Sequence, residues 1–283
     1  MHPSQRPSAV QSFRRATVRL AVIVLITYVV LVASLMLFEE KLVFFPSPYP
    51  EGDWNPAGLE LEDAHFVAPD GVKLHGWYVP HEKARAVVLF AHGNGGNLAG
   101  RADVLRVLHA DLRLSVMIFD YRGYGRSEGS PNEGGVLADA RAARAWLAER
   151  ADVPETEIVL LGRSLGGGVM VDLATSDGAR GLILESTFTS LPDVAAGHYP
   201  WAPVNLLMRN RLDSLSKIGR YAGPLLQSHG TADQIIPYEL GQQLFDAAET
   251  ENKQFIALKN YGHNQMPPRR YYEQLDAWIE QLP

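Results

Sequence analysis

Short apolar runs alternate with helix-patterned stretches along most of this chain. Eight runs are predicted to be strands, at residues 65–67, 72–78, 86–90, 116–119, 158–161, 181–184, 224–227 and 255–258. The dipeptide Asp70-Gly71 separates the first two and favours a tight hairpin turn. Helical periods occupy residues 135–150, 169–175 and 238–248. This alternation predicts an α/β fold, with a mainly parallel eight-stranded sheet and helices on both faces.

A longer apolar run precedes the alternating region. From Leu20 to Phe38, nineteen consecutive residues carry no formal charge, and nearly all are aliphatic. A helix of that length is roughly 28 Å long, enough to span the hydrocarbon core of a bilayer. The pattern predicts one transmembrane helix within residues 1–45, followed by a globular domain at 46–283. A cleaved signal peptide is the alternative, although its apolar region is usually about 7–15 residues long.

Basic residues give the predicted span a direction. Arg6, Arg14, Arg15 and Arg19 precede it, whereas only Lys41 follows it closely. Because basic flanks tend to stay cytoplasmic, we expect a cytoplasmic N-terminus and a globular domain on the other side of the membrane. The formal charge is −6, and −10 without those four arginines. So acidic a domain argues against a nucleic-acid partner.

Aromatic residues and prolines alternate over residues 44–56, directly after the predicted span. This composition suits a stiff connector at the level of the lipid headgroups. A plain linker with incidental aromatics fits the same residues equally well.

Several kinds of chemistry are excluded or unsupported by the composition. The chain has no cysteine, which excludes disulfides, thiol catalysis and thiolate metal sites. A dinucleotide-binding turn at residues 93–98 fails because Leu98 occupies the third glycine position. We expect no cofactor and no bound metal. No paired ligand spacing relates the histidines His65, His75, His81, His109 and His198.

Glycines surround a serine directly after the predicted strand at 158–161. The sequence there is Gly162-Arg163-Ser164-Leu165-Gly166, and a helical run follows it. In a nucleophile elbow, the serine sits in a strained conformation at a sharp turn from strand to helix, and small neighbours avoid collision there. We therefore predict Ser164 as an exposed nucleophile. A glycine-rich turn with a helix-capping serine is the alternative.

Two further turns offer partners for this serine, which needs a base and an acid that orients the base. The strand at 224–227 leads to Asp233, and the strand at 255–258 leads to His263. Residues that follow parallel strands gather at one edge of the sheet. Glu185 also follows a strand and is the alternative acid.

With these motifs the chain resembles the α/β-hydrolase superfamily, specifically its single-pass membrane-anchored serine hydrolases related to monoacylglycerol, lysophospholipid and acyl-protein hydrolases. The resemblance covers roughly residue 42 to the C-terminus. It is carried by His92-Gly93-Asn94, Asp120-Tyr121-Arg122-Gly123-Tyr124-Gly125, the Ser164 turn, His229-Gly230 before Asp233, and Gly262-His263.

The resemblance implies a catalytic triad of Ser164 as nucleophile, His263 as base and Asp233 as acid. Backbone N–H groups of Asn94 and Leu165 would then form the oxyanion hole. In this arrangement His92 would be a structural residue of its turn.

The implied activity is hydrolysis of carboxylic ester or thioester bonds through an acyl-enzyme, on lipid-like or acylated substrates. The same triad also serves peptidases and acyltransferases, and a non-catalytic hydrolase-like scaffold is a further alternative. Residues 187–220 interrupt the strand pattern where such folds insert a short lid, whose apolar side chains would suit an acyl chain. We also expect Arg122 and Glu128 to hold the loops around the Ser164 turn by internal hydrogen bonds.

Overall fold

The computed structural model describes residues 9–283, so Arg6 of the predicted basic flank lies outside the described residues. Packing divides the chain into two compact units, Met1–Leu42 and Val43–Pro283.

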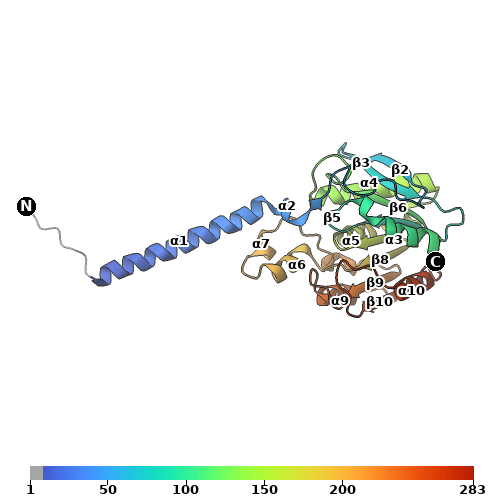
Figure 1. Cartoon of the computed structure of the whole chain (residues 1–283). Coiled ribbons are helices and arrows are strands. Elements are labelled where there is room, and N and C mark those ends of the chain that lie inside the picture. Colours follow the sequence, from blue (N-terminus) through green and yellow to red (C-terminus); the bar gives the residue numbers. More distant parts are fainter. Residues whose placement is uncertain (1–8) are drawn as a thin grey trace, which may run out of the picture. The chain divides into compact units, whose positions relative to one another are not determined.

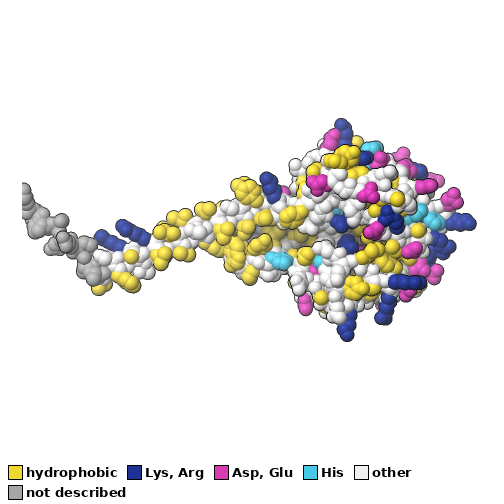
Figure 2. All heavy atoms as spheres, viewed as in Figure 1, with side chains coloured by type: hydrophobic (Ala, Val, Ile, Leu, Met, Phe, Trp, Pro, Cys, Tyr) yellow, Lys and Arg dark blue, Asp and Glu magenta, His cyan; other side chains and the backbone are white. Residues whose placement is uncertain are grey.

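The first unit is built on one long helix, α1 (Ala9–Leu37), which is followed by the short α2 (Glu39–Val43) (Figure 1). Residues Val10–Leu37 have a mean hydropathy of 2.9, and the helix is long and apolar enough to cross a membrane. Apolar side chains cover its length in Figure 2. The predicted apolar helix is confirmed, but it begins at Ala9, about three turns before the uncharged run that starts at Leu20.

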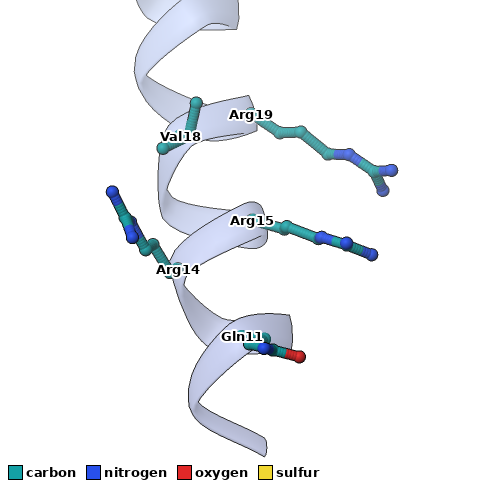
Figure 3. A pocket seen from close by; sticks show the side chains of 5 residues that line it. All are labelled: Gln11, Arg14, Arg15, Val18 and Arg19. Atoms are coloured by element: carbon teal, nitrogen blue, oxygen red, sulfur yellow. The ribbon is translucent and has the colours of Figure 1, made fainter. Parts of the chain in front are cut away.

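Basic side chains gather near the N-terminal end of α1. Figure 3 shows Arg15 and Arg19 extending on one side of the helix and Arg14 on the other. Residues four positions apart share a helix face, which explains this division. The hollow beside them is lined by Gln11, Val18 and the three arginines, all from this one helix.

The second unit contains an eight-stranded sheet in the order β10-β9-β8-β7-β4-β6-β3-β2. All eight predicted strands are present. Within residues 9–283, only the pairs β2–β3 and β3–β6 of this sheet are antiparallel, so the sheet is mixed but mainly parallel, as predicted. The strands are β2 (Glu62–Val67), β3 (Lys73–Val79), β4 (Val87–Ala91), β6 (Ser115–Asp120), β7 (Val159–Arg163), β8 (Gly181–Glu185), β9 (Leu225–Gly230) and β10 (Lys253–Leu258).

Each face of the sheet carries its own apolar core, because alternate residues of a strand point to opposite faces. In β4, Leu89 packs into one cluster, whereas Val88 and Phe90 pack into the other. The first cluster is covered by α4 (Glu133–Ala151), α5 (Leu165–Asp177) and α9 (Tyr238–Ala247). The second is covered by α10 (Arg269–Ile279) and by three short consecutive helices, η1 (Leu98–Arg101), α3 (Ala102–Arg106) and η2 (Val107–Asp111). Helices therefore lie on both faces, as predicted.

Arg122 makes internal hydrogen bonds, but not around the Ser164 turn. Its guanidinium donates to Asp139 of α4 and to Asp70 at the hairpin turn, so it fastens that hairpin to the helix. The hydrogen bonds that Arg122 donates to Asp139 and Asp70 outweigh burial and raise the pKa of Arg122 above its usual range. The Glu128 side chain is mainly exposed beside Lys73. The expectation that these two residues hold the loops around Ser164 is wrong.

Residues 187–220 fold into three short helices instead of strands: α6 (Leu191–His198), α7 (Val204–Leu207) and α8 (Leu215–Ile218). The Ser190 side chain caps α6 by accepting from the backbone N–H of Asp193. Tyr199, Trp201 and Leu206 expose much of their apolar surface here. The segment therefore exposes apolar side chains on the protein surface.

Two glycines allow the backbones of β4, β7 and α5 to come into direct contact. A Cβ atom added to Gly162 at the end of β7 would lie 2.4 Å from the Gly166 carbonyl oxygen. A Cβ atom added to Gly166 in α5 would lie 2.0 Å from the Ala91 carbonyl oxygen. Atoms that close overlap, and the obstacles are backbone atoms that cannot rotate away.

We expect Gly166→Ala to lower the melting temperature by about 3–10 °C, because overpacking against backbone typically costs about 1–3 kcal/mol. Thermal unfolding followed by circular dichroism measures this change. Gly197→Ala is the matched control, since Gly197 is also helical but has nothing within 4 Å of the added atom. Equal melting temperatures for the two variants would contradict the steric argument.

Candidate active site

Ser164 occupies a sharp turn between β7 and α5. Its backbone angles are φ 54° and ψ −119°, a conformation that costs a non-glycine residue about 1–3 kcal/mol. Hydrogen bonds hold this backbone in place. The Ser164 N–H donates to the Glu185 carbonyl at 2.9 Å, and the Ser164 carbonyl accepts from the Thr187 hydroxyl at 2.9 Å. The strand, the strained serine and the helix together form the predicted elbow.

The structure brings Ser164, His263 and Asp233 together in one hydrogen-bonded chain. His263 Nε2 lies 3.0 Å from Ser164 Oγ, and His263 Nδ1 lies 2.7 Å from Asp233 Oδ2. Since Asp233 can only accept, Nδ1 carries the ring proton and Nε2 is left to accept from the serine hydroxyl. This tautomer is the one that a general base requires.

Asp233 is held from several sides. Its Oδ1 accepts the backbone N–H groups of Ile235 and Ile236, both at 2.9 Å. Its Oδ2 lies 3.3 Å from Nε2 of His229, a second histidine, which is fully buried. His229 Nε2 also faces the Ile236 carbonyl at 3.0 Å, so this nitrogen faces two acceptors and carries a proton. Sequence reasoning found His229 as part of a motif but did not foresee this contact.

These contacts set the ionisation of the acid. Burial alone would raise the pKa of Asp233, but hydrogen bonds from His229 and His263 outweigh burial and hold the pKa well below the usual range of a carboxyl. The group therefore stays a carboxylate at neutral pH.

Ser164 is less exposed than predicted, at 7% of its possible surface. It lines a cleft of about 540 Å³ together with His263. Ile235 and Met266, each nearly half exposed, contribute apolar surface to the same cleft. The serine is shielded because the turns after several strands surround it, yet its cleft remains open to a small molecule.

Leu165 directly follows Ser164, and Asn94 lines the same cleft. Leu165 is the first residue of α5, and the first N–H groups of a helix have no partner within it. Asn94 lines the cleft beside Gly93, where an added Cβ atom would lie 3.4 Å from Cβ of Ser164. The Asn94 carbonyl is held by the Tyr124 hydroxyl at 2.8 Å, which orients this peptide.

The first residues of the second unit pair with this loop. Strand β1 (Phe45–Pro46) lies parallel to β5 (Gly95–Gly96), and the Phe45 N–H donates to the Asn94 carbonyl at 3.0 Å. The Asn94 side-chain amide donates to the Val43 carbonyl at 3.0 Å. The start of the segment expected to be a stiff connector or a plain linker is thus hydrogen-bonded to the Asn94 loop.

His92 and Glu185 occupy buried positions next to the site. His92 Nδ1 faces its neighbouring carbonyl at 2.7 Å, and its Nε2 lies 3.4 Å from Asp120, so it supports its own turn. Glu185 accepts a short hydrogen bond from the Tyr271 hydroxyl. His263 takes Asp233 as its partner, so the alternative acid is wrong in this structure.

One cluster on the strands β2 and β3, at one edge of the sheet, groups possible metal ligands. Asp63, His65 and His75 each offer an atom within 4.8 Å of the others, because the β2–β3 register places His65 opposite His75. Sequence reasoning missed this proximity. However, Asp63 already bonds His75 at 2.7 Å and lies 3.4 Å from Arg126. A guanidinium so close opposes a cation at this place.

Several known proteins are similar to this chain. Residues 82–216 match a family model described as serine aminopeptidase, S33. Rv2307c, an uncharacterized protein of Mycobacterium tuberculosis, is 40% identical over 231 residues, which is 80% of either chain. The alpha/beta hydrolase domain-containing protein WAV2 of Arabidopsis thaliana is 34% identical over 275 residues, 88% of this chain and 85% of that one. The solved esterase Pf2001 of Pyrococcus furiosus has a TM-score of 0.70 at 19% identity, covering 85% of this chain and 98% of that chain, which shows a shared fold.

The depressed pKa of Asp233 makes the stability of the fold depend on pH. Such a carboxylate stabilises the fold above its unfolded pKa, about 3.9, and this contribution is lost as the pH falls below that value. We expect Asp233→Asn to melt below the wild type at pH 7, and we expect this gap to narrow from pH 5 to pH 2.

Melting temperatures across that range, measured by circular dichroism, test this dependence. Asp246→Asn is the control, because Asp246 is exposed on α9 and should show little gap at any pH. A gap for Asp233→Asn that stays constant down to pH 2 would show that the carboxylate is not stabilised in the fold.

Proposed function

We propose that this chain, which belongs to the α/β-hydrolase family of its relatives, is a serine hydrolase that cleaves carboxylic ester or thioester bonds. One observation carries the proposal: Asp233, His263 and Ser164 form a hydrogen-bonded chain, with distances of 2.7 and 3.0 Å, at a strained elbow. Such a chain activates a hydroxyl that is otherwise a poor nucleophile.

The mechanism follows from the positions of the protons. His263 removes the Ser164 proton as Oγ attacks the carbonyl carbon, and the carbonyl oxygen becomes an oxyanion. His263 then gives the proton to the leaving group, and an acyl-enzyme remains on Ser164. Water attacks this acyl-enzyme with His263 again acting as base, which releases the acid and restores the serine.

Asp233 and two backbone amides assist these steps. The Asp233 carboxylate holds the tautomer of His263 and stabilises the imidazolium that forms in passing. The N–H groups of Asn94 and Leu165 would donate to the developing oxyanion, and losing one such donor typically costs about 10²–10³ in rate. The support for Asn94 is its place in the cleft, and for Leu165 its place directly after Ser164.

We further propose lipid-like or acylated substrates. Ile235 and Met266 add apolar surface to the cleft, and Tyr199 and Trp201 expose apolar rings on the segment proposed as a lid. That segment is tied to the acid loop, since His198 Nε2 lies 2.8 Å from the Ile235 carbonyl. An acyl chain would gain binding energy from such surfaces.

A peptidase activity has the description of the matching family model in its favour. An aminopeptidase needs negative charge to bind a free amino group, but the titratable side chains at this cleft include Arg101 and Arg163, and its Asp103 pairs with Arg106. Two guanidinium groups repel an ammonium group. We therefore favour the esterase.

Helix α1 is proposed to anchor the protein in a membrane, with the N-terminus cytoplasmic and the catalytic domain on the other side. The support is its apolar length and the arginines at its N-terminal end.

We expect Ser164→Ala to lower ester hydrolysis at least 10³-fold and to abolish labelling by a fluorophosphonate probe, because no other group can form the acyl-enzyme. Turnover of a short aryl ester and in-gel probe fluorescence measure the two effects. Ser130→Ala, at an exposed serine, is the control and should behave as wild type. Residual wild-type activity in Ser164→Ala would remove this serine from the mechanism.

Membrane anchoring by α1, and its orientation, can be tested separately from the catalytic activity. In membranes from expressing cells, we expect the full chain to stay in the pellet after alkaline carbonate extraction, and a protease added to the non-cytoplasmic side to digest the catalytic domain. Release by carbonate would contradict the anchor. Digestion only from the cytoplasmic side would reverse the orientation.

A further inference from the structure

Two arginines at the cleft lack the carboxylate partners that other arginines have. Within residues 9–283, neither Arg101 nor Arg163 forms an ion pair with an acidic side chain. Both line the cleft that holds Ser164 and His263. Other arginines with little exposure do pair with carboxylates, namely Arg85 with Asp276, Arg122 with Asp139, and Arg144 with Glu155.

Arg101 uses few of its hydrogen-bond donors. It lies at the end of η1, and its Nη2 donates to the Gly95 carbonyl at 2.6 Å. Its Nε is buried and has no partner among the described residues. Burial and the nearby charge of Arg163 both lower the pKa of Arg101. Keeping a charged guanidinium buried with an unbonded N–H costs free energy, and a bound anion would offset that cost.

Arg163 stands directly before Ser164, at the end of β7. Its Nη2 donates to the His263 carbonyl at 2.9 Å and to the Gln265 carbonyl at 3.3 Å. These hydrogen bonds hold the guanidinium against the loop that carries His263. Its charge therefore lies close to the serine, and carbonyl dipoles do not neutralise it.

The negative charges at the cleft are already engaged. Asp103, on α3, pairs with Arg106 and is mainly exposed. Asp233 is bonded by two histidines and two backbone amides. The two guanidinium groups at the cleft thus remain without an ion pair among residues 9–283, although the protein as a whole has a formal charge of −6.

We propose that Arg101 and Arg163 form a subsite for an oxyanionic group of the ester, a carboxylate or a phosphate. This inference rests on the proposed function, because it names the substrate class of the same site. The guanidinium fork matches either oxyanion and binds it with charge-assisted hydrogen bonds. Ile235 and Met266 supply apolar surface in the same cleft, so the substrate joins an anionic group to an apolar acyl part.

Matched pairs of esters test the subsite in the full-length protein. The first pair is an aryl butyrate and the aryl monoester of succinate, which places the anion on the acyl side. The second pair is monobutyrylglycerol and its phosphomonoester, which places the anion on the leaving group. For each pair, the measured quantity is the ratio of kcat/KM for the anionic ester to kcat/KM for the neutral ester.

We expect the wild type to prefer the anionic member of at least one pair, and the pair that responds identifies the side on which the anion lies. Arg101→Gln should lower that ratio about tenfold or more, because a charge-assisted hydrogen bond is lost. Arg101→Lys keeps the positive charge but loses the planar guanidinium fork. Its ratio should therefore fall between those of the wild type and Arg101→Gln. Added salt should lower the wild-type ratio by screening the charges.

The matched control is Arg150→Gln, which removes a guanidinium paired with Glu62 on an exposed surface and should leave both ratios unchanged. Ser164-dependent turnover without preference for either anion would overturn the subsite and leave the serine hydrolase standing. An Arg101→Gln variant that slows both members of a pair equally would assign Arg101 a structural role and also overturn it. Absence of any Ser164-dependent turnover would overturn both proposals.

Discussion

The candidate site depends on how closely the backbones of β4, β7 and α5 approach one another beneath Ser164. Gly162 and Gly166 have no side chains, so the helix can start against the carbonyl of Ala91 without an atom in between. At this approach the chain turns sharply, with Ser164 at φ 54° and ψ −119°, and α5 begins at the next residue. Hydrogen bonds that join the Ser164 backbone to the Glu185 carbonyl and the Thr187 hydroxyl stabilise this strained turn within the buried sheet.

Charge is distributed unevenly around this turn. On one side, Asp233 is surrounded by hydrogen-bond donors, so its negative charge is stabilised and directed at His263. Elsewhere, in the cleft, Arg101 and Arg163 carry positive charge and form no ion pair with an acidic side chain of the described residues. These charges support the two proposals: the Asp233 carboxylate would stabilise a positive imidazole, and the two guanidinium groups would attract a negative substrate.

The loop of Asn94 links the chemistry to the beginning of the domain. Its carbonyl accepts from Phe45 and Tyr124, and its side chain reaches the Val43 carbonyl. In the sequence, these first residues follow directly on the apolar helix. The strands β1 and β5 have only two residues each, and so short a pairing opens more easily than the main sheet. This loop is thus hydrogen-bonded to a segment whose composition suggested a stiff connector or a plain linker.

Local patterns in the sequence were enough for the elements and for the chemistry of the elbow. Apolar runs bounded by polar turns identified all eight strands of the main sheet, and Gly162-x-Ser164-x-Gly166 between a strand and a helix predicted the elbow, because sterics at such a turn act between near neighbours. Only the tertiary structure decided which acid meets His263, how far Ser164 is buried, and that β1 joins the Asn94 loop. It alone brought Arg101 and Arg163 to one cleft and left both without an ion pair to an acidic side chain among residues 9–283. Contacts between residues far apart in the chain depend on register, crossovers and packing, and a single sequence read by period and motif contains no distances between them.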